Sequence, residues 1–225
     1  LFPYTTLFRS DARTAEMCKL TENSFRDVNI AFANELSLIC SDLGIDVWEL
    51  IELANHHPRV NILQPGPGVG GHCIAVDPWF IVDAAPQTAR IIRAAREIND
   101  GKPKWVLSKV EEAVRAKPDS TIAVLGLAFK ANIDDLRESP SLKIAEDIAS
   151  NFGDSRVLAV EPNVAELPSS LSEFENVELA EAEKAVESAD VVVLLVDHNE
   201  FVNLWGPEMT NKTVIDTKGL WLRQS

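Results

Sequence analysis

The stretch Thr121-Ile122-Ala123-Val124-Leu125-Gly126-Leu127-Ala128-Phe129 decides the fold of this chain. A short apolar run of this kind, rich in strand-forming residues, is typical of a strand buried on both faces of a parallel sheet. Further strands are predicted at 156–160, near Val177, at 190–196 and at 213–216, with helices at about 141–151 and 180–187 between them. Strands that alternate with helices predict a doubly wound, parallel α/β sheet.

The carboxyl ends of these strands form the edge at which such sheets bind ligands. Four ends can be read from the sequence: Phe129-Lys130, Glu161-Pro162, Asp197-His198 and Thr217-Lys218. Two of them carry a lysine, and an ammonium group suits a phosphate. The second half of the chain is therefore expected to bind an anionic ligand at this edge.

The first half of the chain has a helical period instead. From about 14 to 43, apolar residues recur at steps of three and four, which predicts one buried stripe of a long amphipathic helix. The stripe consists of Phe25, Val28, Phe32, Leu36, Ile39 and Leu43. Gly44 is expected to end this helix, and a second helix is predicted at Val47–Asn55.

Two further helical patterns follow, at 86–100 and 105–114. Gly101 and Pro103 lie between them, so either a kinked long helix or a short break is expected. The change of period after 117 divides the chain into an all-helical domain at 11–117 and an α/β domain at 118–225.

An irregular stretch interrupts the helices: Gly66-Pro67-Gly68-Val69-Gly70-Gly71-His72-Cys73-Ile74-Ala75-Val76-Asp77-Pro78. Its glycines allow the backbone to approach a ligand closely and let N–H groups point into a site. Cys73, with an imidazole and a carboxylate nearby in sequence, is a candidate nucleophile. The alternatives are a tight loop without chemistry, a cysteine that is only a small buried hydrophobe, and an Asp77 that only caps the next segment.

Gly66-x-Gly68-x-x-Gly71 matches the dinucleotide-binding fingerprint literally. We reject that interpretation, because no strand precedes the motif, Pro67 lies inside it, and no acidic residue follows a second strand about twenty residues later.

A polar face on the first helix is a second candidate. Lys19, Asn23 and Arg26 are spaced so that they share one side of that helix. The face is either part of a site or simply solvated.

The composition excludes several classes of protein. The 225 residues are 46% hydrophobic and 25% charged, with a net charge of −14, which argues against a nucleic-acid partner but allows a small anionic ligand. Cys18, Cys40 and Cys73 have no CxxC spacing, so neither a disulfide framework nor a zinc site is implied, and reduced thiols in the cytoplasm fit best. No apolar run reaches the length of a membrane span.

Residues 1–10 are too short and too polar for a signal peptide, and they do not begin with Met. They resemble translated sequencing-adapter read-through. We therefore leave them out of the fold and interpret the remainder, from Asp11, as a fragment.

Taken together, the motifs resemble those of the UDP-sugar 6-dehydrogenase family, enzymes that oxidise a nucleotide sugar twice to a uronic acid. The likeness rests on Gly68-Val69-Gly70-Gly71-His72-Cys73 with Asp77, on Ala15-Glu16-Met17-Cys18-Lys19 with Asn23, and on Gly126-Leu127-Ala128-Phe129-Lys130 through Arg137-Glu138-Ser139. It covers about 11–223. The stretches 21–29 and 61–80 are specific for the branch that acts on UDP-N-acetyl-D-mannosamine. Val76 stands where UDP-glucose enzymes usually carry Lys, which favours an N-acetylated sugar.

The resemblance implies a central helical domain for dimerisation, followed by a Rossmann-like UDP-binding domain. A Rossmann domain for NAD is expected before Asp11 and is not in the sequence. Cys73 is expected to be the nucleophile, with Lys19 and Asn23 stabilising the oxyanion and Asp77 positioning the hydrolytic water.

The resemblance also implies binding residues. Those expected to contact the sugar nucleotide are Arg26, His57, Arg59 and Gly70, with His57 and Arg59 reaching across a dimer interface. Those expected to hold the UDP are Phe129, Lys130 and Lys218, and Arg137 is expected to touch NAD. The Phe25 stripe and the helical segment 86–116 are the expected core of a homodimer.

The implied function is the NAD-dependent, four-electron oxidation of UDP-N-acetyl-D-mannosamine to its uronate, for a bacterial surface polysaccharide. UDP-glucose and UDP-N-acetylglucosamine are the alternative substrates. An alternative of another class is a dimeric UDP-sugar-binding module that does not oxidise its ligand.

Overall fold

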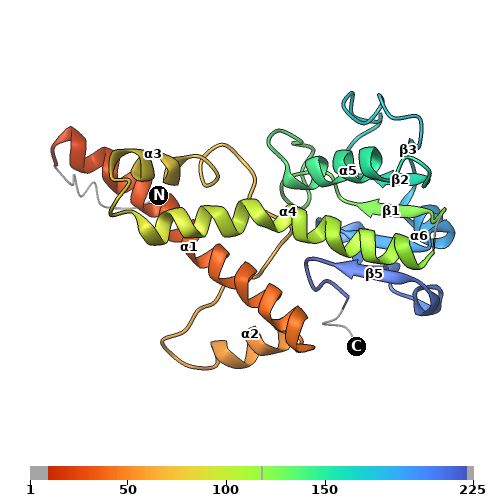
Figure 1. Cartoon of the computed structure of the whole chain (residues 1–225), viewed down its shortest axis with the longest axis horizontal. Helices are drawn as coiled ribbons and strands as arrows, with labels where there is room; N and C mark the ends of the chain where they lie inside the picture. Colours follow the sequence, from red (N-terminus) through yellow and green to blue (C-terminus); the bar gives the residue numbers. More distant parts are fainter. Residues whose placement is uncertain (1–9, 118, 222–225) are drawn as a thin grey trace, which may run out of the picture.

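The computed structural model describes residues 10–117 and 119–221. A helical half and a sheet half lie end to end, and one long helix, α4 (Arg90–Ala116), runs through both (Figure 1). The helical half also holds α1 (Ala12–Leu43), α2 (Val47–Asn55) and α3 (Asp77–Ala84). The glycine-rich stretch lies between α2 and α3, outside any helix or strand.

Local sequence explains where α1 and α2 begin and end. Asp11 caps α1 by accepting a hydrogen bond from the amide of Thr14, and Asp46 caps α2 by accepting from the amide of Trp48. Gly44 ends α1 with a φ of 66°, a conformation that glycine adopts without steric cost. The predicted end of α1 and both predicted bounds of α2 are confirmed.

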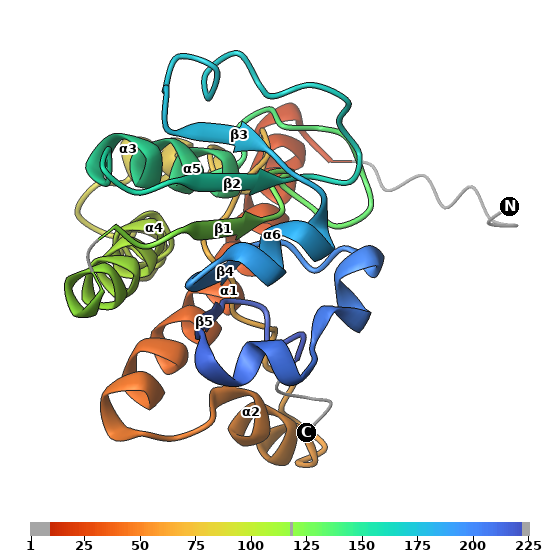
Figure 2. The same cartoon turned by 90° about the vertical axis from the view of Figure 1, so that its right-hand side faces the viewer.

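The second half forms a five-stranded parallel sheet, as predicted (Figure 2). Its strands are β1 (Ile122–Leu125), β2 (Val157–Val160), β3 (Val177–Leu179), β4 (Val191–Leu194) and β5 (Thr213–Asp216), in the order β3-β2-β1-β4-β5. Helix α5 (Pro140–Asn151) follows β1, and α6 (Ala182–Ser188) follows β3. Two 3₁₀ helices, η1 (Asn199–Leu204) and η2 (Pro207–Asn211), connect β4 to β5.

Both faces of the sheet are covered. Ile122 and Val124 belong to the core that β1 shares with α4 and α5, whereas Ala123 and Leu125 belong to the core shared with α6 and η1. Figure 2 shows α4 and α5 on one side of the sheet and α6 on the other. Because both faces are buried, the strand is apolar throughout, which explains its continuous hydrophobic run.

The order of the strands reverses at β1, because the chain returns after β3 to add β4 on the other side. Leu125 pairs with Val160 of β2 and with Leu194 of β4, so the three carboxyl ends lie level. Open α/β sheets bind their ligands at such a reversal. This is the edge at which the sequence predicts an anionic ligand.

The helix predicted at 86–100 begins later, at Arg90, and continues through Gly101 and Pro103 to Ala116. The alternative of a short break is therefore wrong. A proline inside a helix removes a hydrogen bond, but α4 packs on α1 and α3 as well as on α5, β4 and β5, and these contacts outweigh the local preference. Since α4 belongs to both halves, the domain boundary at 117–118 stays a prediction.

The prediction that the apolar stripe of α1 is buried is wrong within a single chain. Phe25, Phe32, Ile39 and Leu43 are exposed, Phe25 to 69%. The residues that α1 buries are small or polar: Asn23, Ser24, Asp27, Ala31, Ala33, Asn34, Ser37 and Cys40. The physical reason is that α4 presents polar side chains to α1, and buried polar groups need polar partners.

Two further properties concern the described residues alone. Within residues 10–117 and 119–221, no three His, Cys, Asp or Glu side chains gather into a group that could hold a metal ion. No helix of that part combines the length and the apolar character needed to cross a membrane.

Candidate active site

A cavity of about 440 Å³ lies where the glycine-rich stretch meets the carboxyl ends of the strands. Residues 64–70 form one wall, and the segments after β1, β4 and β5 form the others. Four residues that the family resemblance assigns to the UDP-sugar share this cavity: Gly70, Phe129, Lys130 and Lys218. Residues from the helical half and from the sheet half thus line one space.

Residues 66–74 are called the glycine loop below. The glycines of this loop allow its backbone to pack closely against the start of α5. A Cβ atom at Gly70 would lie 2.6 Å from Cδ of Pro140 and 2.7 Å from the carbonyl oxygen of Glu138. A Cβ atom at Gly68 would lie 2.9 Å from Cβ of Pro140. Larger residues at these positions would push the loop away from the sheet half.

The turn that leads from β1 to Phe129 and Lys130 is held by a buried carboxylate. Glu161, directly after β2, accepts hydrogen bonds on Oε2 from the amides of Leu127 (2.8 Å) and Ala128 (3.0 Å). The Glu161 side chain therefore fixes the backbone that presents two of the candidate ligand residues.

His198, after β4, completes this clamp. The amide of Asn132 donates to Nδ1 of His198 at 3.0 Å, so a neutral ring carries its proton on Nε2, which lies 3.1 Å from Oε2 of Glu161. Burial alone would raise the pKa of Glu161, but the hydrogen bonds from His198 and from the two amides outweigh it and lower that pKa to about 2. The carboxylate is thus held in its ionised form.

The clamp decides which groups are available to an anion at this edge. In related sheets, amides at the turn after the first strand hold a phosphate, but here two of them are engaged by Glu161. Lys130 is exposed, and Nζ of Lys218 lies 3.2 Å from Oδ1 of Asp197. Positive charge at this edge of the cavity is therefore carried by the lysine side chains.

Cys73, near the other end of the glycine loop, has an exposed thiol. Its carbonyl oxygen accepts a hydrogen bond from the amide of Asp77 at 2.8 Å, in the turn that begins α3. Asp77 is the first residue of α3, a helix without a side-chain cap, so the capping alternative is wrong. Oδ2 of Asp77 instead accepts a hydrogen bond from Nδ2 of Asn23 at 2.5 Å.

The residues of the polar face of α1 differ in burial: Asn23 is buried, whereas Lys19 and Arg26 are exposed. Asn23 is 5% exposed, so the solvated interpretation does not hold for it. Lys19, one turn earlier, is exposed and lies 3.8 Å from Glu22, and Arg26 is exposed as well. Neither cation is among the described residues that line the cavity.

The remaining assigned residues lie on exposed loops. The amide of Arg59 donates to Nδ1 of His57 at 3.2 Å in the segment after α2. Arg137 makes two side-chain hydrogen bonds to Asp135, at 2.9 and 2.7 Å. The roles of these three residues stay predictions.

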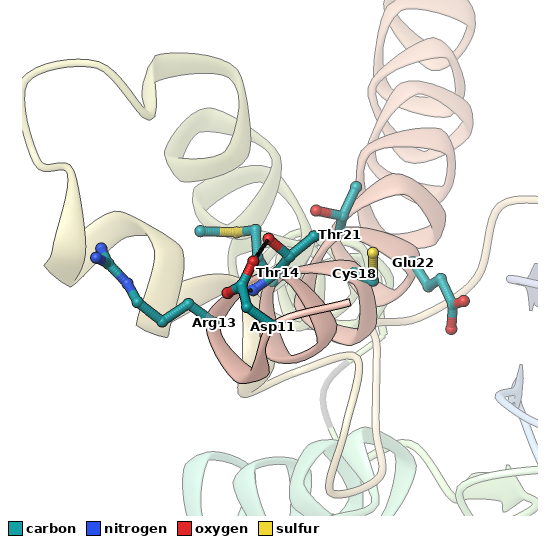
Figure 3. A pocket seen from close by; sticks show the side chains of 7 residues that line it. Asp11, Arg13, Thr14, Cys18, Thr21 and Glu22 are labelled. Carbon is teal, nitrogen blue, oxygen red and sulfur yellow. Dashed lines mark hydrogen bonds between the residues drawn. The ribbon is translucent and has the colours of Figure 1, made fainter. Parts of the chain in front are cut away.

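A separate hollow of about 720 Å³ lies on the first turns of α1 (Figure 3). Seven described residues line it: Asp11, Arg13, Thr14, Met17, Cys18, Thr21 and Glu22. Asp11 accepts hydrogen bonds from the amide and the hydroxyl of Thr14, at 3.0 and 2.8 Å, which serves to begin the helix. Those seven include none of the residues that the resemblance assigns to the UDP-sugar, whereas four such residues line the cavity at the strand ends, which is therefore the better candidate site.

Sequence reasoning missed several buried polar residues. It noted Glu161 and His198 only as strand ends, and it gave no role to Asp27, Asn34 or Arg96. A signal was present, because polar residues recur every three positions on α4: Arg96, Asn99 and Lys102. Such spacing predicts a polar helix face, but not that the face is buried.

Two family models match the chain. They describe the central domain of the UDP-glucose/GDP-mannose dehydrogenase family, at residues 13–101, and the UDP binding domain of that family, at residues 123–223. The chain belongs to this family. The glycine loop, Asn23 and Asp77 lie within the first match, and the lysines at the strand ends lie within the second. The family resemblance read from the motifs is confirmed.

Relatives in the family carry names that specify N-acetylated sugars. The chain is 62% identical over 213 residues to an NDP-N-acetyl-D-galactosaminuronic acid dehydrogenase of Ralstonia solanacearum, covering 94% of this chain and 49% of the relative. It is 60% identical over 220 residues to a UDP-N-acetyl-D-mannosamine dehydrogenase of Salmonella typhi, covering 94% and 52%. A solved UDP-N-acetyl-mannosamine dehydrogenase of Staphylococcus aureus is similar in fold, with a TM-score of 0.77, 45% identity, and 94% of this chain and 49% of that chain covered.

The chain spans about half the length of these relatives. The family's cofactor, NAD, does not fit the described residues by themselves. No strand leads into the glycine loop, and the turn after β1 uses two of its amides to bind Glu161. Neither the glycine loop nor the turn after β1 thus has the arrangement of the dinucleotide-binding fingerprint.

Proposed function

We propose that the chain is the substrate-binding, thiol-bearing part of an NAD-dependent dehydrogenase that converts UDP-N-acetyl-D-mannosamine to UDP-N-acetyl-D-mannosaminuronate. The observation that carries this proposal is the one cavity shared by the glycine loop and the lysine-bearing strand ends. A UDP-sugar needs both parts, since its diphosphate requires positive charge and its sugar requires a close approach to the thiol.

Cys73 is proposed as the nucleophile. Conversion of a primary alcohol to a carboxylate removes four electrons, and an aldehyde lies halfway. The thiolate of Cys73 adds to that aldehyde to give a thiohemiacetal, whose oxidation gives a thioester that water hydrolyses to the carboxylate and the free thiol. The oxidant for the two steps would be NAD, of which two molecules, bound one after the other, would each take up one hydride.

Asn23, Lys19 and Asp77 are proposed to assist these steps. Nδ2 of Asn23 carries two hydrogens, of which one is given to Asp77 and the other can stabilise the oxyanion. The charge of Lys19 would stabilise the same oxyanion and favour the thiolate. Asp77 would accept a proton from the hydrolytic water, and its bond to Asn23 holds its carboxylate in place.

The diphosphate is proposed to lie at the strand ends, between Lys130 and Lys218, with Phe129 beside it. The backbone of Gly70 would contact the sugar. Arg26, His57 and Arg59 are exposed in a single chain, and we propose that the last two act on a second protomer's substrate. Arg137 is exposed and directly precedes Glu138, whose carbonyl oxygen contacts the glycine loop. We propose that Arg137 touches NAD bound to a separate domain.

A homodimer is part of this proposal. The apolar stripe of α1 is exposed in one chain, and a contiguous uncovered apolar surface is typical of an interface. A two-fold axis would pair this stripe with its copy, since the commonest oligomers use the same patch on both subunits.

The sugar is proposed to be N-acetylated, because Val76 replaces the lysine of UDP-glucose enzymes. The names of the relatives include two kinds of N-acetylated sugar, a mannosamine derivative and a galactosamine derivative. UDP-glucose and UDP-N-acetylglucosamine remain the alternatives. We further propose a cytoplasmic location and a role in surface polysaccharide synthesis.

Kinetics of the chain joined to the NAD-binding domain of its own gene would test the proposal. We expect two NADH for each UDP-N-acetylmannosamine, and a kcat/KM higher for that sugar than for UDP-glucose or UDP-N-acetylglucosamine. Cys73→Ser should lower the rate by at least about a hundredfold, since the covalent route is lost. Full turnover by Cys73→Ser would refute the assignment of the nucleophile.

The alternative function, a UDP-sugar-binding module that does not oxidise its ligand, applies to the 225 residues as they stand. The observation that favours it is the absence of a dinucleotide site among the described residues. NAD reduction by the purified chain alone would refute it, and UDP binding without reduction would support it.

A further inference from the structure

A row of buried polar side chains fills the seam between α1 and α4, where two packed helices usually bring apolar residues together. Its members are Asp27, Asn34 and Ser37 on α1 and Arg96, Asn99 and Lys102 on α4, each no more than 9% exposed. Burying so many polar groups is costly unless each finds a partner.

Hydrogen bonds connect four of these residues into one chain, the polar ladder: Asp27, Asn34, Arg96 and Asn99. Oδ1 of Asp27 accepts from Arg96 at 2.6 Å and from Nδ2 of Asn99 at 2.8 Å. Oδ1 of Asn99 accepts from Nδ2 of Asn34, also at 2.8 Å. Each side chain thus fixes the orientation of the next.

Both ends of the polar ladder reach the glycine loop. Oδ1 of Asn34 accepts a hydrogen bond from the amide of Gly66, the first residue of the loop, at 2.9 Å. A guanidinium nitrogen of Arg96 lies 3.5 Å from the carbonyl oxygen of Ile74, the last residue of the loop. The segment that contains Gly70 and Cys73 is therefore suspended between two anchors on the same network.

We propose that the polar ladder positions the glycine loop, with Asn34 and Arg96 as positioning residues that fix its two ends. That this placement matters for the thiol of Cys73 rests on the proposed function, whereas the anchoring of the loop does not. Neither residue touches the cavity. Each acts through the backbone that lines it.

Such anchors have a clear physical purpose. A glycine-rich loop has more backbone freedom to lose than any other kind, so without fixed ends it would sample many positions. A displacement of about 1 Å in a reacting group can cost about a hundredfold in rate. The polar ladder supplies the rigidity that the loop sequence lacks.

Hydrogen exchange of the 225-residue chain tests the anchoring. Asn34→Ala removes the acceptor of the Gly66 amide, and Ser37→Ala is the matched control. Ser37 lies one turn further along the same buried face and bonds to Lys102 rather than to the loop. We expect amides of residues 66–74 to exchange roughly five- to tenfold faster in Asn34→Ala, as for the loss of one net hydrogen bond, and to be unchanged in Ser37→Ala.

The pattern of exchange separates positioning from general stability. Faster exchange confined to the loop supports the proposal. Unchanged exchange there, or an equal increase throughout α4 and the sheet, would overturn it. Should Asn34→Ala fail to fold, Asn34→Ser provides the same test, because its hydroxyl is polar but too short to reach Gly66.

The reactivity of the thiol tests the second end of the polar ladder. Arg96→Lys keeps a cation near Asp27 but is shorter and cannot reach Ile74. Alkylation of Cys73 by iodoacetamide, followed by mass spectrometry of its peptide, should change in rate at least threefold relative to the exposed Cys18 in the same molecule. An unchanged ratio would contradict the role of Arg96. If Cys73→Ser leaves turnover intact in the complete enzyme, the proposed function fails while the exchange data still decide on the anchoring.

Discussion

Glu161 illustrates how a single side chain organises one wall of the cavity. Its carboxylate bonds to two successive amides and to an imidazole, so it joins the ends of β1, β2 and β4. The same arrangement removes two amides from the set of donors that an incoming phosphate could use. One residue therefore supports the binding wall and also restricts what can bind there.

Glu161→Gln should destabilise the chain by about 1–3 kcal/mol at neutral pH, since a charge-assisted network is lost inside the protein. The folded-state pKa of Glu161 is lowered to about 2 from an ordinary 4.5. Its contribution is thus fully present above pH 4.5 and is lost as the pH falls toward 2. Urea unfolding between pH 7 and pH 3 would measure both effects. If Glu161→Gln lost as much unfolding free energy between pH 7 and pH 3 as the original chain does, Glu161 would not be the source of this pH dependence.

Two glycines in different elements provide a matched pair. A Cβ atom at Gly70 in the glycine loop would meet Pro140 at 2.6 Å, whereas one at Gly101 in α4 would have nothing within 4 Å. Gly70→Ala should therefore lower stability by about 1–3 kcal/mol and weaken UDP binding, because the loop must move. Gly101→Ala should stabilise the chain by about 0.5–1 kcal/mol, since alanine favours a helix.

Thermal unfolding and calorimetric titration with UDP would measure this pair. The two variants should shift the melting temperature in opposite directions, and Gly70→Ala alone should change the affinity for UDP. Equal behaviour of the two variants would show that the close packing of the loop on α5 has no energetic consequence.

Lys102 makes α4 sensitive to pH. Burial lowers the pKa of Lys102 to about 7 from 10.5, while its contact with the ring of Trp105, 3.7 Å from the centroid, favours the charged form. Between these two pKa values the unfolded chain binds a proton that the folded chain does not. Stability should therefore rise as the pH rises from about 7 to about 10.5.

Lys102→Met should remove this rise and stabilise the chain at pH 6 by about 1–4 kcal/mol, because a buried charge is replaced by an apolar chain. Lys104→Met, at an exposed position of the same helix, is the control and should leave the slope unchanged. Guanidinium unfolding at pH 6, 8 and 10 would check both variants. The same pH slope in Lys102→Met as in the original chain would contradict the assignment.

Local patterns in the sequence were sufficient for most elements. The apolar runs at β1 and β4 and the glycine that ends α1, Gly44, each act within a few positions, so they could be read directly. The polar ladder could not be read from the sequence, because Asn34 and Asn99 meet only through the packing of two helices. For the same reason, helical spacing could place Asn23 on a polar face with Lys19 and Arg26, but its bond to Asp77 appears only in the fold.

At the scale of the whole molecule, the apolar stripe of α1 is the largest departure from expectation. Its period correctly indicates a helix, but periodicity cannot say which face meets the same chain and which meets another. The structure leaves Phe25 and Phe32 exposed, at 69% and 51%. The proposed homodimer would cover them, and it would also bring His57 and Arg59 to a second cavity.

Phe32→Glu should convert the dimer to a monomer, because two like charges would face each other across a two-fold axis. Glu49→Lys, an exposed change on α2, is a control for charge alone. Sedimentation velocity at micromolar concentration would give the mass of each species. A monomeric original chain, or a dimeric Phe32→Glu, would contradict the proposed interface.

In the proposed enzyme, the glycine loop holds Cys73 where the sugar is oxidised. The most direct measurement is mass spectrometry of the complete enzyme, acid-quenched during turnover of UDP-N-acetylmannosamine with NAD. In an Asp77→Asn variant, in which hydrolysis is slowed, we predict a sugar-nucleotide adduct on the peptide that contains Cys73 and none after Cys73→Ala. Formation of two NADH per sugar without any adduct on Cys73, or with an adduct elsewhere, would contradict the account.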